Sequence, residues 1–86
     1  MKLFSVYDRK AKEFGPLFEA KNEEVAIRQF KNMLASERML SPEDYSLHSF
    51  GEFDRENGHI LLEVEGNFLV FAGVNFVESK NAEVLR

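Results

Sequence analysis

A single stretch with helical periodicity lies between two stretches whose patterns predict β-hairpins, and this order limits the chain to one small mixed fold. In the central stretch, apolar residues recur at three- and four-residue spacing, at Ala26, Ile27, Phe30, Met33 and Leu34. Such spacing places them on one side of an α-helix. Asn22 is a suitable N-cap, and the two glutamates that follow it complement the positive end of a helix. We therefore expect an amphipathic helix that begins after Asn22 and extends as far as Arg38.

The first hairpin is predicted before this helix. Residues 2–8 are rich in β-branched and aromatic side chains, and a second run follows at residues 14–20 after a charged stretch of about six residues. Pro16 falls within the returning run, and a proline cannot donate to a central ladder. The second strand is therefore expected either to lie at an edge of the sheet or to begin after Pro16.

The second hairpin is predicted after the helix. Ser41 followed by Pro42 favours one helical turn before the next strand. From residue 45 the pattern alternates, with Tyr45, Leu47 and Phe53 in one phase and Ser46, His48 and Glu52 in the other. Residues 54–58 end in Asn57-Gly58, a strong turn signal because both residue types tolerate positive φ. Residues 59–65 should return as a strand that places Ile60, Leu62 and Val64 on one side.

These patterns predict an α+β fold in which two β-hairpins form an antiparallel sheet against one amphipathic helix, in the order ββαββ, followed by an extended C-terminal segment. For residues 67–77 the pattern suits both strand and helix, and extended structure is favoured. At 86 residues the chain can enclose one core. We expect a single domain over residues 1–78 and a polar tail over residues 79–86.

Composition restricts the chemistry. The chain has no cysteine, which excludes disulfides and thiolate metal sites and fits a reducing compartment. Charged residues come too early for a signal peptide, and the longest apolar run, residues 68–72, cannot span a bilayer that needs about 20. No membrane association is expected. The net charge of −4 conceals an asymmetry, because residues 1–38 carry eight basic and six acidic side chains whereas residues 39–86 carry three basic and nine acidic ones. An anion-binding surface would belong to the first half.

Catalytic or metal-binding groups are not indicated. The predicted second hairpin separates His48 from His59 by about 16 Å at the usual strand rise, so the two cannot share an ion. The carboxylates of the second half fall in turns and on strand faces, where a solvated acidic surface explains them, and a docking surface for a basic partner is the alternative. Neither a nucleophile elbow nor a phosphate-binding glycine loop occurs. We expect a protein without enzymatic activity, cofactor or metal.

Basic and aromatic side chains are interleaved in the first half. Single-stranded nucleic acid is commonly held by cations along the phosphates and by aromatic rings against the bases. Phe14 and Phe18 lie among these cations, although a solvated surface over a Phe-rich core would explain the same residues. The candidate nucleic-acid-binding residues are Lys2, Tyr7, Arg9, Lys10, Lys12, Lys21, Arg28 and Lys31.

The sequence also resembles the small nonstructural protein of gokushovirus-type microviruses, small single-stranded DNA phages that include the chlamydiaphages. The first part of the likeness lies in residues 3–11 and in Phe14, Pro16 and Phe18, which follow them. The second part lies in residues 42–47 and 51–54 and in Gly58. The likeness covers residues 2–64. Proteins of this kind often have a proline-containing segment next, where this chain has residues 64–67 instead.

The resemblance implies a nonstructural protein made in the cytoplasm of the infected bacterium that assists viral single-stranded DNA synthesis, with no catalytic residues to transfer. Its partners would be single-stranded DNA, phage or host replication proteins, or both. The alternative is a protein–protein adaptor or regulator that uses the acidic half or a strand edge without touching DNA. Open strand edges also favour a homodimer.

Overall fold

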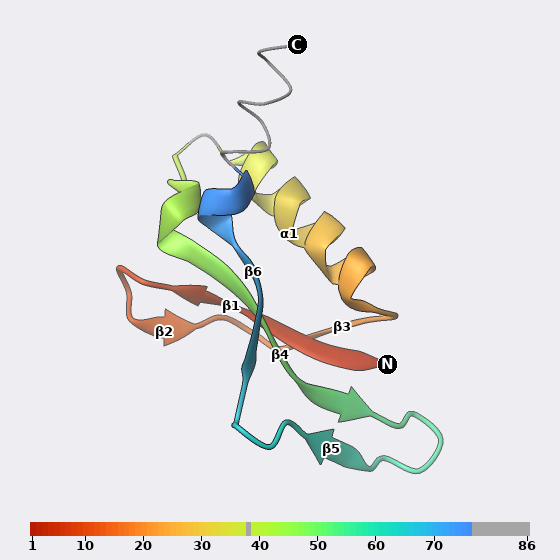
Figure 1. The fold of residues 1–86 in the computed structure, drawn as a ribbon. Helices are drawn as coiled ribbons and strands as arrows, with labels where there is room; N and C mark the ends of the chain where they lie inside the picture. Colours follow the sequence, from red (N-terminus) through yellow and green to blue (C-terminus); the bar gives the residue numbers. More distant parts are fainter. Residues whose placement is uncertain (38, 77–86) are drawn as a thin grey trace.

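The computed structural model describes residues 1–37 and 39–76. Its core element is an antiparallel sheet with one main helix against it, which confirms the predicted α+β class (Figure 1). The predicted polar tail at residues 79–86 and the domain boundary at residue 78 lie outside the described residues. The helix predicted to extend as far as Arg38 ends earlier, at Ser36, because Glu37 is already extended. No helix among the residues described has the length and apolarity needed to cross a bilayer.

Two long strands form the centre of the sheet. Strand β1 (Lys2–Asp8) and strand β4 (Tyr45–Phe53) run antiparallel along nearly their whole length. Each has two short strands along its outer side, and all the pairings are antiparallel. Strands β2 (Glu13–Phe14) and β3 (Phe18–Ala20) pair with β1, whereas β5 (Ile60–Leu62) and β6 (Phe68–Ala72) pair with β4.

Pro16 interrupts the strand beside β1. Strand β2 ends before Gly15-Pro16 and β3 begins after it, so the predicted second strand is present in two pieces at an edge of the sheet. The Gly15 amide still donates to the Val6 carbonyl at 2.9 Å, and the buried Ser5 hydroxyl donates to the Gly15 carbonyl at 2.7 Å. These two bonds hold the chain against β1 at the interruption.

The C-terminal segment is part of the sheet rather than a separate extension. Strand β6 pairs with β4 from Ser46↔Ala72 to Ser49↔Phe68, and residues 73–76 that follow it are helical. The ambiguous stretch is thus strand first and helix afterwards. Gly73 begins the helical part against the backbone carbonyl of Pro42, where a Cβ would collide with that oxygen.

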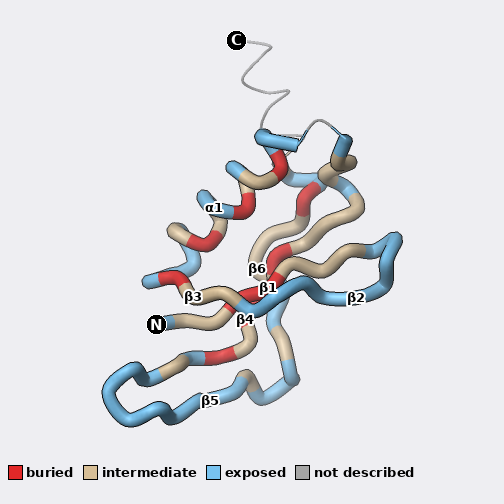
Figure 2. Tube along the Cα trace, turned by 180° about the vertical axis from the view of Figure 1, so that it is seen from behind, coloured by how far each residue is buried: buried red, intermediate tan, exposed pale blue. Residues whose placement is uncertain are grey.

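Helix α1 (Glu23–Ser36) covers one face of the sheet. The Asn22 side chain caps it by accepting from the Val25 amide at 2.9 Å, as predicted. Its Ala26, Phe30 and Leu34 are buried against Phe4, Ala20 and Leu47 of the strands. Figure 2 shows these buried segments facing one another across the space between α1 and the sheet.

Both predicted hairpins are present, but the lengths of their loops differ from the prediction. Asp8 pairs with Glu13, so the first loop has four residues rather than about six. Phe53 pairs with Ile60, so the second loop covers residues 54–59 rather than 54–58, and the Asp54 amide donates to the His59 carbonyl at 2.9 Å within the turn. The single helical turn expected at Pro42 is present as a 3₁₀ turn, η1 (Pro42–Asp44).

A β-bulge in β4 changes the predicted alternation. Leu3 pairs with Gly51 and Phe4 with Ser49, so Phe50 is an extra residue in the ladder. Side chains after the bulge change faces, and Phe53 therefore does not share a face with Leu47 as its phase suggested. Gly51 has φ +146 and lies against the Leu61 carbonyl, which leaves no room for a Cβ.

The second returning strand is also shorter than predicted. Strand β5 covers Ile60–Leu62 instead of residues 59–65. The expected one-sided apolar face is absent from the described structure of β5, because Ile60, Leu61, Leu62 and Val64 are all exposed.

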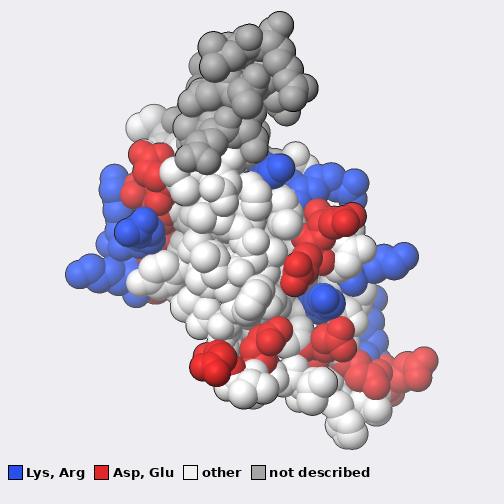
Figure 3. All heavy atoms as spheres, viewed as in Figure 1, with Lys and Arg blue, Asp and Glu red and all other residues white. Residues whose placement is uncertain are grey.

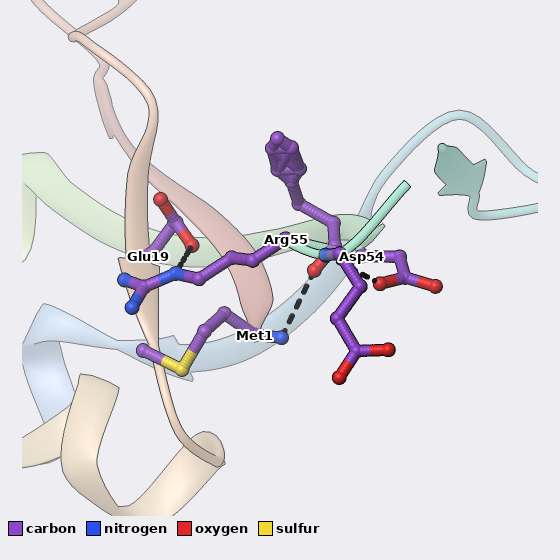
Figure 4. Close-up of polar contacts among 6 residues, drawn as sticks. Met1, Glu19, Asp54 and Arg55 are labelled. Atoms are coloured by element: carbon purple, nitrogen blue, oxygen red, sulfur yellow. Dashed lines mark hydrogen bonds and ion pairs between the residues drawn. The ribbon is translucent and has the colours of Figure 1, made fainter. Parts of the chain in front are cut away.

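Two contacts attach the β4–β5 turn to the first half of the chain (Figure 4). The Met1 ammonium donates to the Phe53 carbonyl at 3.0 Å, and the Phe53 amide donates to the Met1 carbonyl at 2.8 Å. The Arg55 guanidinium in the turn contacts the Glu19 carboxylate on β3 at 3.1 Å. The second hairpin is therefore attached to the beginning of β1 and to β3, where Glu19 pairs with Leu3.

Candidate nucleic-acid interface

The two faces of the sheet have different roles. Phe4, Val6 and Leu47 alternate onto the face that packs on α1. Cross-strand partners in an antiparallel pair lie on the same face. The opposite face carries a row of cross-strand partners, in which Phe14 pairs with Tyr7, Tyr7 with Ser46, and Ser46 with Ala72. We call this opposite side the open face.

An aromatic cluster occupies the open face, with Phe14 at its centre. The Phe14 ring lies 4.8 Å from Tyr7, 5.3 Å from His48 and 5.2 Å from Phe50 between ring centroids. The His48 and Phe50 rings meet Phe14 edge to face, at interplanar angles of 88° and 84°. This geometry is favourable for aromatic pairs. The cluster therefore forms a fixed platform, and Phe14 is 39 % exposed within it.

Hydrogen bonds fix the orientation of His48. Its Nδ1 lies 2.8 Å from Asn67 Oδ1, and because a carboxamide oxygen only accepts, Nδ1 donates. Its Nε2 lies 2.8 Å from the Ser46 hydroxyl, which then donates to Nε2. The structure thus places His48 as a hydrogen-bonded strand residue. Within residues 1–37 and 39–76, no three His, Asp or Glu side chains converge as metal ligands would.

A shallow pocket of about 440 Å³ adjoins the aromatic cluster. Tyr7 and His48 form part of its wall, together with Leu69 of β6. Arg9 and Glu43 also line it, so the pocket places a cation and a carboxylate beside an apolar surface. A flat apolar ring with a charged substituent would fit such a site chemically.

The β1–β2 turn presents the cations next to this pocket. The Asp8 carboxylate accepts from the Lys10 and Ala11 amides at 3.0 and 3.1 Å, which fixes the turn, and Lys12 adopts φ 60. The Arg9 amide donates to the Asp44 carbonyl at 2.8 Å. Arg9, Lys10 and Lys12 are all exposed. The Lys10 ammonium contacts the Asp44 carboxylate at 3.3 Å, so part of its charge is compensated.

The other predicted cations lie elsewhere. Lys2 lines a pocket on the helix side with Glu23 and Glu52, and Lys21 lies in the connection between β3 and α1. Arg28 and Lys31 are on α1, and the Lys31 ammonium lies 5.1 Å from the Phe71 ring centroid. Figure 3 shows basic side chains gathered on two sides of one face of the molecule, with a broad uncharged surface between them. The structure thus brings Tyr7, Arg9, Lys10 and Lys12 together and places Lys2, Lys21, Arg28 and Lys31 on other elements.

The aromatic residues also divide. Phe18 packs on Phe4 in the core, with ring centroids 5.9 Å apart, and so does not accompany Tyr7. Sequence reasoning missed Phe50 and Leu69, and it considered His48 only as a metal ligand or base. The alternation from Tyr45 did place His48 on the face of the strand opposite to that of Leu47. The bulge that brings Phe50 to the open face had one signal, the adjacent Gly51, since isolated strand glycines often mark bulges.

Comparison with known proteins identifies the family. The family described as phage ORF5 protein matches residues 1–76. The chain belongs to the phage ORF5 protein family. Within this family, protein ORF5 of Chlamydia phage 1 is 33 % identical over 85 residues, which are 90 % of this chain and 88 % of the phage protein. This confirms the resemblance to gokushovirus-type microviruses, and the match extends beyond the expected residues 2–64. No solved structure matches this ORF5-family chain significantly.

Proposed function

We propose that this phage protein is a non-enzymatic accessory in viral single-stranded DNA synthesis, and that it binds single-stranded DNA in the cytoplasm of the infected host. In this proposal the phosphates lie along the β1–β2 turn and one base lies against Tyr7 in the pocket of the open face. Replication proteins would be recruited to the same DNA.

The observation that supports this proposal is that Tyr7 of the aromatic cluster shares a pocket with the exposed cation Arg9. Both residues line one pocket, and Tyr7 lies 4.8 Å from Phe14 in ring-centroid separation. Proteins that hold single strands combine stacking rings with cations that follow the backbone. Bases in a duplex are already stacked and paired, so a platform of rings favours an unpaired strand.

The charge balance predicts weak and salt-sensitive binding. The net charge of −4 opposes a long, sequence-independent DNA footprint. With Lys10 paired to Asp44, Arg9 and Lys12 would displace few counterions, and the affinity for a single strand should fall with a log–log salt slope of about −1.4. Binding is therefore expected at low salt and on short oligonucleotides.

A titration of labelled oligonucleotides by fluorescence anisotropy at several salt concentrations tests the proposal. The double variant Arg9→Glu/Lys12→Glu should lose most of the affinity and flatten the salt slope by about 1.4, because two phosphate contacts are removed. The matched control is Lys21→Glu/Arg28→Glu, which makes the same charge change on the helix side. Absence of binding at low salt, or equal losses in both double variants, would contradict the proposal.

A protein–protein adaptor is the second candidate, and the exposed apolar side chains around β6 favour it. Phe68, Leu69 and Val74 are 59 %, 53 % and 45 % exposed, and Figure 3 shows an uncharged surface in the region of β4 and β6. Contiguous exposed apolar surface is typical of interaction sites. In a pull-down from infected cells, a nuclease-resistant complex with a replication protein would support the adaptor, and a nuclease-sensitive one would support DNA binding.

A further inference from the structure

Strand β5 is an edge strand with aliphatic side chains on both of its faces. Ile60, Leu61 and Leu62 are 57 %, 73 % and 71 % exposed, and among the described strands β5 pairs with β4 alone. Edge strands of monomeric proteins are usually protected by charged side chains, prolines or bulges, since an open apolar edge pairs readily with other chains. The composition of β5 is therefore that of a strand with a partner on its free side.

The hydrogen-bond pattern shows which backbone groups face outward. The Asp54 amide donates to the His59 carbonyl, and the Glu63 amide donates to the Phe50 carbonyl. In an antiparallel ladder, residues directed toward the neighbouring strand alternate with residues directed away from it. Residues 59, 61 and 63 are thus directed toward β4, and the N–H and C=O groups of Ile60 and Leu62 are directed to the free side.

We propose that β5 pairs antiparallel with β5 of a second copy of this chain about a two-fold axis at Leu61. Ile60 then exchanges backbone hydrogen bonds with Leu62 of the partner subunit, and Leu61 faces Leu61 of the partner subunit in a non-hydrogen-bonded pair. Apolar side chains meet on both faces of the joined sheet, which accounts for the three consecutive aliphatic residues. One patch contacts its own copy, as a two-fold interface requires.

The polar residues next to β5 fit this register. Pairing about Leu61 places His59 opposite Glu63 of the partner subunit, on the same face as Leu61. The imidazole can donate to the carboxylate, and the two Glu63 carboxylates lie at opposite ends of the paired segment. A shift of the axis by one residue in either direction places Glu63 opposite an aliphatic side chain or beyond the strand. The sequence around β5 is thus complementary to itself.

The β4–β5 hairpin is held ready for this contact. The Arg55–Glu19 ion pair and the Met1–Phe53 hydrogen bonds attach its turn to the first half of the chain (Figure 4). Val64 and Phe68, which follow β5 in the chain, are also exposed. A ladder this short buries little compared with the roughly 800 Å² per partner of a standard stable interface, so the dimer should dissociate on dilution.

Cysteine variants test the register, because the natural chain has no cysteine. In a non-hydrogen-bonded antiparallel pair the Cα atoms are about 4.5 Å apart, within the range for a disulfide, so Leu61→Cys should cross-link to its own copy under mild oxidation. The matched control is Ile60→Cys, which is similarly exposed and one residue away. In the proposed dimer, residue 60 of one subunit and residue 60 of the other are diagonal neighbours about 7–8 Å apart, which disfavours a disulfide between them.

Light scattering after size-exclusion chromatography gives the second measurement, on the natural chain over a wide concentration range. The expected result is a mass that rises from that of one chain to that of two, with Leu61→Cys locked at the dimer mass much faster than Ile60→Cys. A single-chain mass at every concentration would overturn the proposal. Equal cross-linking of both variants, which would indicate association through another surface, would overturn it as well.

Discussion

The rings of Tyr7 and Phe14 face each other across the first hairpin, with centroids 4.8 Å apart and planes inclined at 55°. They are direct partners in the ladder between β1 and β2, so the register of the hairpin itself creates the contact. The four-residue turn that closes this hairpin carries Arg9, Lys10 and Lys12. A short loop therefore couples the position of three cations to that of a stacking platform.

Replacing the Tyr7 ring should separate DNA binding from folding. Tyr7→Leu keeps an apolar side chain but removes the aromatic face, and loss of one stacked base costs about 1–3 kcal/mol of binding free energy. Oligonucleotide affinity measured at low salt should fall accordingly, while the circular dichroism spectrum stays unchanged. Phe18→Leu is the matched control, because Phe18 packs in the core and its replacement should lower thermal stability without lowering the affinity.

Neutralising Asp44 should strengthen DNA binding. The Asp44 carboxylate contacts Lys10 at 3.3 Å, and Asp44→Asn would release that cation for a phosphate and steepen the salt slope by about 0.7. The Lys10 side chain is 78 % exposed, so the loss of this ion pair should change stability little. The matched control is Glu19→Gln, which makes the same charge change but releases Arg55 in the β4–β5 turn instead of a cation in the β1–β2 turn. An equal gain in affinity from both variants would show that only net charge matters.

The close approach of β4 and β5 at Gly51 should make that glycine irreplaceable. Gly51→Ala places a Cβ against the Leu61 carbonyl at φ +146, and the backbone must shift at a cost of about 2–4 kcal/mol. Gly58→Ala is the comparison, since Gly58 also has positive φ but open space around it, and only the conformational cost of about 1–2 kcal/mol applies. Urea unfolding of the two variants measures the difference, and equal losses would contradict the bulge geometry.

The local elements of the fold could be predicted because each depends on nearby residues. Asn22 caps α1, Pro16 interrupts the first returning strand, and Asn57-Gly58 forms part of the second turn. The pairing of β6 with β4 could not be predicted, since a strand's partner depends on contacts distant in sequence and its pattern also suited a helix. The phase of Phe53 was wrong because the bulge at Phe50 inserts one residue that alternation alone does not reveal.

The candidate site was predictable only where its residues are close in sequence. Tyr7, Arg9, Lys10 and Lys12 are neighbours in sequence and remain neighbours in space, whereas grouping them with Arg28 and Lys31 required knowing on which side of the sheet α1 packs. The cation–π contact of Lys31 with Phe71 depends on the placement of β6. Long-range placement, rather than residue type, decides which cations share a surface.

Backbone amide chemical shifts of the labelled protein, followed while a short single-stranded oligonucleotide is added, give the most direct test of the proposed interface. We expect shifts concentrated at Tyr7, Arg9, Ser46 and His48, with residues of α1 around Arg28 unaffected. Shifts confined to the helix side, or an unchanged spectrum at low salt, would contradict it.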